Sequence, residues 1–277
     1  MNLQQMEYVK TIAETKSMNK ASEVLHVSQP ALTKQLKILE DELKTILFER
    51  DNSGCHLTKE GELFLVEAKK ILNQVHSLKQ QFVQRENKVI NIGTLPSIAA
   101  HFLPGIVKKL NNSGHKINIH IAETSEQIKN LLFDGKIDVG FGQDVKKRDY
   151  VYSILIEPYY LIVPEAHPLG EAKSISLSDI TNQNMIVPTL PCDIRISLDK
   201  YLKHQGIVME NMMEVGQNDS MLSLVKNGVG LTILPKMAVN AIDKSVKAIP
   251  IKSGEFNRKI SLLTHSKELH DLIIGQI

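Results

Sequence analysis

Two short helical patterns follow each other near the amino terminus with a two-residue turn between them, and this arrangement restricts the fold more than any other feature of the chain. Ser17 is expected to cap a helix over residues 18–25. After the turn at residues 26–27, Ser28 is expected to cap a second helix, with Pro30 in its first turn, where a missing N–H costs little. Two helices joined so tightly, the second of them polar on one face, are typical of a helix-turn-helix.

The second helix has an apolar face and a polar face at helical spacing. The apolar face holds Leu32, Leu36 and Leu39, and the polar face holds Gln29, Thr33 and Lys37, with Pro30 and Lys34 beside them. Glutamine can pair with adenine through two hydrogen bonds, and lysine can donate to guanine or to phosphate. The spacing alone leaves two interpretations open, a DNA-reading surface or a solvated helix face.

A turn and a long helix follow. Residues 51–54, DNSG, are a strong turn signal between two short extended segments, so a small β-hairpin or wing is expected. Thr58 is expected to cap a helix from residue 59 to about residue 87. Apolar residues recur along it at alternating spacings of four and three, which favours pairing with a second helix, although packing on the core of its own domain is the alternative. This seam consists of Leu57, Gly61, Phe64, Ala68, Ile71, Val75, Leu78 and Phe82.

From residue 88 onward the pattern changes to strands that alternate with helices, which predicts an α/β fold with parallel strands and right-handed crossovers. In the first unit, strands are expected at residues 88–94, 116–123 and 137–143, with helices at 96–111 and from 125 to 135. In the second unit, extended segments are expected at 152–164, 184–189, 213–219 and 228–235, with helices at 176–180, 195–205 and 220–227. A last strand near residues 259–265 is expected to return to the first unit. Two lobes joined by crossing strands are the architecture of periplasmic binding proteins.

Composition limits the class of protein and its compartment. The 277 residues are 42% hydrophobic and 23% charged, which is ordinary for a globular protein. The amino terminus is polar, and no window approaches the ~20 apolar residues of a membrane span, so a cytoplasmic protein with no membrane partner is expected. The net charge of +2 means that any DNA contact must come from the local placement of cations. The ten histidines show no metal-binding spacing, so no metal site is predicted.

Several runs of residues together form a specific signature. At the amino end it consists of Ser17, Ala21, Leu25, the run 27–32, Leu39, Glu40, the run 47–50, Leu57, Thr58 and Gly61, and weaker runs follow at 90–94, 102–104, 133–142, 163–169 and 225–235. By this signature the chain resembles the LysR-type transcriptional regulators over nearly its whole length. It departs from the usual pattern at Lys44, where the family usually has glycine, and at Glu60, where it usually has alanine.

The resemblance implies a division into three parts. Residues 1–58 would form a winged helix-turn-helix DNA-binding domain, residues 59–87 a linker helix for dimerisation, and residues 88–277 an effector-binding domain. Within the last, lobe I would comprise about 88–160 plus 260–277, and lobe II about 161–259. The resemblance also implies a homodimer through the linker helix, a homotetramer at promoters, contact with RNA polymerase, and a small-molecule inducer rather than a cofactor.

Within this family pattern the polar face of the second helix is expected to enter a major groove of double-stranded promoter DNA. The expected DNA-binding residues are Ser17, Lys20, Ser28, Gln29, Pro30, Thr33, Lys34, Lys37 and Thr58. Of these, Ser17, Lys20 and Thr58 lie near helix starts, where hydroxyls and backbone N–H groups suit phosphate contact.

The effector is expected beyond the carboxyl ends of the strands, where helix N-termini point. Thr94 and Ser97 lie at such a place, and the resemblance implies that the effector-binding residues also include Gln143 in the first lobe and Thr189, Arg195 and Asn218 in the second. The hydroxyls and the arginine favour an anionic metabolite. Two alternatives stay open: Ser97 can be an ordinary helix cap, and Arg195 can form a salt bridge within the protein.

Other functions have weaker support. Some relatives sense oxidants through two cysteines in the second lobe, but here Cys192 has only Cys55, in the wing, as a second cysteine. A cytosolic metabolite-binding protein without DNA function is the second interpretation, and the helix-turn-helix argues against it. An enzyme is not expected, because the chain has no GxSxG, no P-loop and no complete GxGxxG.

Overall fold

The computed structural model describes all residues except 52–53, 84–88, 217, 241, 243 and 253–255, and all of their side chains except those of residues 50, 76–77, 79–83 and 218–219. The chain divides into two compact units. The amino-terminal unit is built on residues 1–87, and the second is built on residues 88–132 and 136–277.

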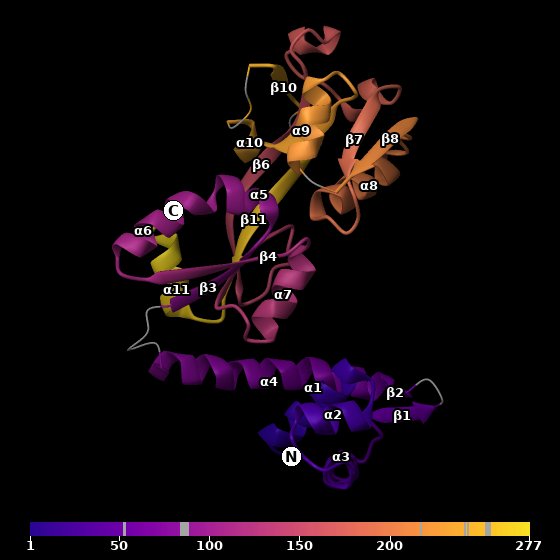
Figure 1. The fold of residues 1–277 in the computed structure, drawn as a ribbon, viewed down its shortest axis with the longest axis vertical. Helices are drawn as coiled ribbons and strands as arrows, with labels where there is room; N and C mark the ends of the chain where they lie inside the picture. The colour runs from indigo at the N-terminus through magenta and orange to yellow at the C-terminus, as the bar shows by residue number, and fades with distance from the viewer. Residues whose placement is uncertain (52–53, 84–88, 217, 241, 243, 253–255) are drawn as a thin grey trace. The chain divides into compact units, whose positions relative to one another are not determined.

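The amino-terminal unit is three helices, a β-hairpin and a long helix (Figure 1). The elements are α1 (Leu3–Thr15), α2 (Met18–Val24), α3 (Gln29–Leu43), β1 (Phe48–Asp51), β2 (Gly54–Leu57) and α4 (Lys59–Val83). The side chains of Ser17 and Ser28 cap α2 and α3, accepting hydrogen bonds from the backbone of Lys20 and Ala31. The apolar face of α3 packs into one core with α1, α2 and the hairpin. The expected helix-turn-helix is therefore confirmed.

The hairpin is held to the helices by backbone hydrogen bonds. The Glu40 carboxylate on α3 accepts from the backbone N–H of Leu47 at 2.7 Å and of Phe48 at 3.3 Å, which fixes the start of β1. At the other strand, the Cys55 N–H donates to the Lys16 carbonyl at 3.0 Å. These contacts position the wing against the carboxyl end of α1 and the carboxyl half of α3.

Helix α4 packs on α1 and β2 through the first half of its apolar seam. Gly61 and Ala68 are buried in the amino-terminal unit, and a Cβ added at Gly61 would lie 2.1 Å from the Leu47 carbonyl oxygen. Farther along, Ile71 and Leu78 are exposed, at 37% and 55% of their surface. The first half of the seam thus serves the domain's own core, whereas in the second half Ile71 and Leu78 are exposed and Val75 is half-buried. The Phe82 side chain lies outside the described residues.

The second unit has one seven-stranded sheet and one two-stranded sheet. The strands of the large sheet run in the order β10-β6-β11-β5-β3-β4, with β9 also on β6, and the small sheet pairs β7 with β8. The strands are β3 (Val89–Thr94), β4 (Lys116–Ile121), β5 (Val139–Gln143), β6 (Val151–Pro164), β7 (Asn184–Pro188), β8 (Asn211–Val215), β9 (Thr232–Pro235), β10 (Val246–Pro250) and β11 (Asn257–Leu263). The helices are α5 (Pro96–His101), α6 (Leu103–Asn112), α7 (Ser125–Phe133), α8 (Asp193–Gln205), α9 (Asn218–Lys226), α10 (Lys236–Val239) and α11 (Lys267–Ile274), with short 3-10 turns at Pro168–Glu171 and Leu177–Ile180.

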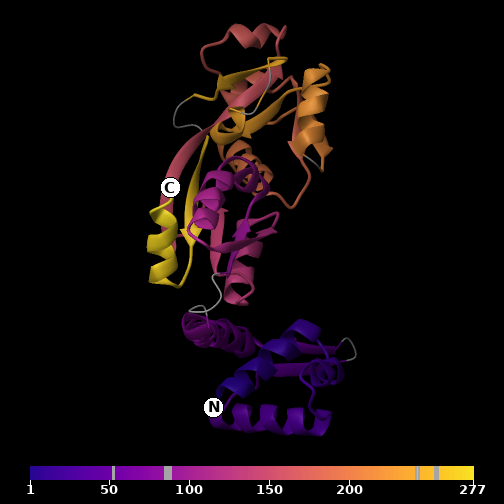
Figure 2. The same cartoon turned by 60° about the vertical axis from the view of Figure 1, so that its left-hand side comes forward.

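Two long strands run through both lobes (Figures 1 and 2). The first half of β6 pairs with β11, and its second half pairs with β9 and β10. One apolar core, around Phe141, covers β3, β5 and the first half of β6, and two others, around Tyr159 and Ile162, lie beyond the crossing. Strand β11 pairs with β5 as well as with β6, which confirms that the last strand returns to the first lobe. Strands β4 and β5 are both parallel to β3, as expected.

The expected single helix over residues 96–111 is wrong, because it breaks at Phe102 into α5 and α6. Pro104 causes the break: it has no N–H to donate to the preceding turn, and its ring clashes with the carbonyl four residues earlier. It is well placed in the first turn of α6 instead. We expected no element at α10 or β10, which are only four and five residues long. Within the described residues, no helix has both the length and the apolar character needed to cross a membrane.

Candidate DNA-binding surface and effector site

The polar face of α3 is open to solvent, apart from one local contact. Lys34, Lys37 and Pro30 are exposed, whereas Leu32, Leu36 and Leu39 on the opposite face are buried. Gln29 and Thr33 are half-buried, and the Gln29 amide donates to the Thr33 hydroxyl at 3.0 Å. This hydrogen bond orients the glutamine amide along the helix surface next to the two lysines. The face therefore presents amide, hydroxyl and ammonium groups from one rigid helix.

Three of the expected DNA-binding residues, Ser17, Ser28 and Thr58, carry hydroxyls that also hold the fold together. Ser17 and Ser28 each accept one hydrogen bond as helix caps, so each keeps a proton to donate. Thr58 accepts from the Gly61 N–H at 2.9 Å and donates to the Ile46 carbonyl at 2.7 Å. Its hydroxyl proton is thus already used inside the protein. Lys20, one turn into α2, is exposed.

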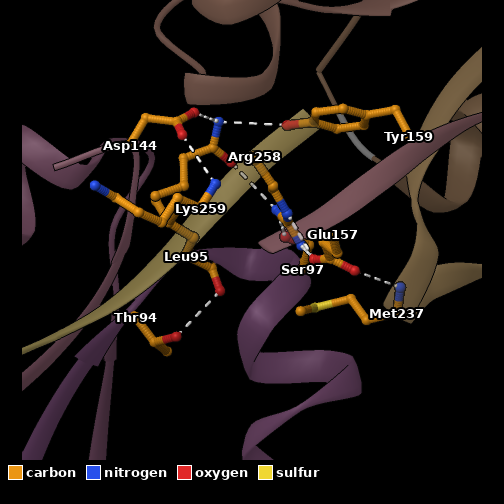
Figure 3. A network of polar contacts seen from close by, with 10 residues as sticks. Thr94, Leu95, Ser97, Asp144, Glu157, Tyr159, Met237, Arg258 and Lys259 are labelled. Atoms are coloured by element: carbon orange, nitrogen blue, oxygen red, sulfur yellow. Dashed lines mark hydrogen bonds and ion pairs between the residues drawn. The ribbon is translucent and has the colours of Figure 1, made fainter. Parts of the chain in front are cut away.

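A buried arginine that the sequence analysis did not single out organises the second site (Figure 3). Arg258, at the start of β11, is fully buried and forms an ion pair with Glu157 on β6, with 2.7 Å between its Nε and Oε1. Its Nη1 donates to the Ser97 hydroxyl at 2.9 Å and to the Gln143 side-chain oxygen at 3.2 Å. Two of the expected effector residues, from α5 and β5, are therefore brought together by a third residue.

The surroundings of this ion pair satisfy most of its polar atoms. The second carboxylate oxygen of Glu157 accepts from the Met237 N–H at 2.8 Å. The Gln143 amide lies 3.4 Å from the Tyr159 hydroxyl, and the Tyr159 ring lies 5.9 Å from the Arg258 guanidinium carbon. Burial raises the pKa of the Tyr159 phenol, so it stays protonated and neutral. The centre thus holds a buried ion pair and several neutral polar groups, and the Asp144 carboxylate lies 3.4 Å from the Gln143 amide nitrogen.

A second group of contacts lies on the other side of Gln143. The Asp193 carboxylate, at the start of α8, accepts hydrogen bonds from the Ser125 N–H at 2.7 Å and from the Ser125 hydroxyl. The Ser125 oxygen in turn accepts from the Gln143 N–H at 2.8 Å, and the Gln143 amide donates to the Ser197 hydroxyl at 3.3 Å. Burial raises the pKa of Asp193, although the hydrogen bonds from Ser125 oppose that shift.

Three other expected effector residues, Thr94, Thr189 and Arg195, make their contacts outside this centre. The hydroxyl of Thr94, which is buried at the end of β3, donates to the Leu95 carbonyl at 3.3 Å. Thr189 is exposed. Arg195 pairs with Asp199 at 2.8 Å and with Glu214 at 3.0 Å, so the salt-bridge interpretation describes what the structure contains. The Asn218 side chain lies outside the described residues.

The alternative interpretation of Ser97 as a helix cap is wrong. The cap position of α5 belongs to Leu95, which makes no side-chain capping bond, and Ser97 instead accepts from Arg258. Glu157 could have been found from sequence as the lone charge in the apolar strand pattern of residues 151–164, whereas Arg258 has Lys259 beside it and gives no such signal. Such a charge is buried only with a partner. Which partner it has depends on strand pairing.

Both parts of the chain match known protein families. Residues 3–62 match the model for the bacterial regulatory helix-turn-helix proteins of the lysR family, and residues 84–274 match the LysR substrate-binding domain. The regulator YtlI of Bacillus subtilis is 30% identical over 276 residues, covering 98% of this chain and 89% of the relative. The regulator CzcR of Bacillus anthracis is 30% identical over 278 residues, covering 96% and 94%.

Solved structures show the same fold. A full-length OxyR variant from Pseudomonas aeruginosa aligns with a TM-score of 0.68 at 21% identity, covering 100% of this chain and 94% of that one. The similar curated proteins named above are transcriptional regulators rather than enzymes. With both family models matched in order, and with relatives aligned along nearly the whole length, the chain belongs to the LysR family of bacterial transcriptional regulators.

Proposed function

We propose that this regulator binds promoter DNA by placing the polar face of α3 in a major groove, and that a small molecule bound between its two lobes switches its activity. The observation that carries the first half is the solvent-facing row of Gln29, Lys34 and Lys37 on a helix whose opposite face is buried. A helix fits the major groove of B-DNA, and these side chains match base edges and phosphates.

Binding as a dimer follows from charge and geometry. The net charge of the whole chain is only +2, so one copy has little general attraction for DNA. The exposed apolar residues in the second half of α4, Ile71 and Leu78, would be covered by the same helix of a second copy. Two recognition helices would then read two half-sites, and further pairing of dimers would give a tetramer. Contact with RNA polymerase would follow from the position of this assembly at a promoter.

The inducer would bind at the carboxyl ends of β3 and β5, next to Ser97, Gln143 and Arg258. The Ser97 hydroxyl accepts from Arg258 and so still has a proton to donate to a ligand. The positive charge of Arg258 is offset by Glu157, so a preference for an anionic ligand would come from hydrogen-bond donors rather than from net charge. Binding would shift the population between lobe arrangements and so change how the pairs of DNA-binding domains are spaced.

Footprinting of the purified protein on the DNA upstream of its own gene and of the neighbouring genes tests the DNA-binding half. Protection of two half-sites on one face of the helix is the expected result, and absence of any protected region would contradict it. A thermal-shift screen of organic acids, amino acids and inorganic anions tests the second half. A ligand that stabilises the protein but leaves both the footprint and transcription unchanged would count against the switch.

A further inference from the structure

The Asp193 side chain forms hydrogen bonds that connect one lobe to the other. It is the first residue of α8, whose Leu198 and Leu202 pack in the core of lobe II. Its hydrogen-bond partner, Ser125, is the first residue of α7, whose Ile128 packs in the core of lobe I. The carboxylate therefore joins two separately packed cores.

Helix α7 does not need Asp193 as a cap. The Thr124 hydroxyl accepts from the Gln127 N–H at 3.2 Å, and the Gln127 side-chain oxygen accepts from the Thr124 N–H at 3.3 Å. This reciprocal pair is a complete capping box within α7 itself. The contact with Asp193 is thus additional to the local structure of the helix.

The hydrogen bonds between Asp193 and Ser125 are charge-assisted, and a second hydrogen bond between the lobes lies beside them. A carboxylate that accepts from backbone N–H groups at a helix N-terminus gains from charge-assisted hydrogen bonds and from the helix dipole. The Ser125 hydroxyl oxygen also accepts a hydrogen bond from the Gln143 backbone N–H. The Gln143 side-chain amide donates a further hydrogen bond to the Ser197 hydroxyl on α8. Two residues of α8 therefore bind the end of β5 and the start of α7 together.

We propose that Asp193 is an intramolecular latch, which holds the two lobes closed in the protein without an inducer. Opening of the lobes then requires the Asp193 carboxylate to leave Ser125. The latch rests on the proposed function for its regulatory meaning, but its physical effect can be measured in the absence of DNA and inducer. A negative footprint would therefore not contradict the latch, and a negative result in the test of the latch would not contradict DNA binding.

Hydrogen–deuterium exchange of the full-length protein, read by mass spectrometry, tests the latch. In Asp193→Ala, exchange at the Ser125 and Gln143 amides should rise about tenfold, because they lose a charge-assisted bond and its neighbour. Exchange at the Met237 amide should also rise. This amide donates to Glu157, and the Met237 side chain packs on the core of lobe I from α10, so it reports on lobe separation at a distance from Asp193.

Glu171→Ala is the matched control. It removes one carboxylate from lobe II, but its partner is the half-buried Lys247 in the same lobe, so all reporter amides should keep wild-type rates. The Ile186 amide, which donates to the Leu231 carbonyl within lobe II, should stay protected in every variant and so excludes general unfolding.

Ser125→Ala removes the hydroxyl donor from the other side of the contact and also the acceptor of the Gln143 N–H, so Met237 is the reporter of lobe separation in this variant and its exchange should rise by a smaller factor. Faster exchange at Ser125 alone, with Gln143 at its wild-type rate in Asp193→Ala and Met237 at its wild-type rate in both variants, would show that Asp193 is only a local partner of α7 and would overturn the latch. Wild-type rates at all three reporters would overturn it as well.

Discussion

Arg258 and Glu157 face each other across β11 and β6 at the point where these strands pass from one lobe to the other, and both side chains are buried. Their ion pair lies 2.7 Å apart and also binds Ser97 and Met237. The charge pair therefore sits at the crossing of the lobes, within reach of residues from both.

Replacement of one partner of this ion pair should lower the unfolding free energy far more than replacement of both partners. Glu157→Gln or Arg258→Met leaves an uncompensated buried charge, which typically costs about 3–5 kcal/mol of stability. The double variant Glu157→Gln/Arg258→Met should recover most of that loss. Calorimetric unfolding of the four proteins measures the coupling. Additive losses in the double variant would show that the two charges do not depend on each other.

The DNA-reading face should be sensitive to two single changes. Gln29→Ala and Lys34→Ala should each weaken promoter binding by roughly 1–3 kcal/mol if each contacts a base edge. Lys203→Ala, an exposed lysine on α8, removes the same charge far along the chain and should bind as wild type. Gel-shift titration measures this. If both α3 variants bound DNA with wild-type affinity, the assignment of α3 as the recognition helix would be wrong.

Replacement of Lys44 by glycine should stabilise the DNA-binding unit. It ends α3 with φ 53° and ψ 37°, in the left-handed region that costs a residue with a side chain roughly 1 kcal/mol. Lys44→Gly should therefore raise the unfolding free energy of the DNA-binding unit by up to about that amount. Lys37→Gly, in the interior of the same helix, should lower it by a similar amount. Urea unfolding distinguishes the two, and equal destabilisation by both would contradict the conformational argument.

The latched state of the lobes, with Asp193 bound to Ser125, should become more stable as the pH falls. Burial raises the pKa of Asp193 above its ordinary 3.8, with Asp144 adding to the shift, while hydrogen bonds from Ser125 and the charge of Arg258 oppose it. The latched state therefore binds a proton more tightly than the open state. A free-energy cost of ionised Asp193 is present above the raised pKa and disappears as the pH falls through it. Amide protection at Ser125, corrected for intrinsic exchange, should rise as the pH is lowered from neutral toward the raised pKa of Asp193.

Asp193→Asn provides the comparison for that pH series. The asparagine keeps an oxygen acceptor for the Ser125 N–H but cannot ionise. Its protection at Ser125 should be independent of pH over the same interval. A slope equal to that of the wild-type protein would assign the pH dependence to another group.

The sequence by itself determined the local elements and the family. Helical spacing in residues 29–43, the serine caps and the alternation of strands and helices depend on neighbouring residues, so they can be read along the chain. The exposed face of α3 followed in the same way, because burial of its three leucines leaves only one face for the polar residues.

The tertiary structure alone decided which charges meet. Glu157 and Arg258 are 101 positions apart, and Ser125 and Asp193 are 68 apart, so no local spacing connects them. Arg195 shows the same limit, since Asp199 lies one turn along its helix but Glu214 comes from β8. A buried charge must find a partner, but the sequence does not say which one. Strand register and the packing of the two lobes make that choice, because only they set the distances between residues far apart in the chain.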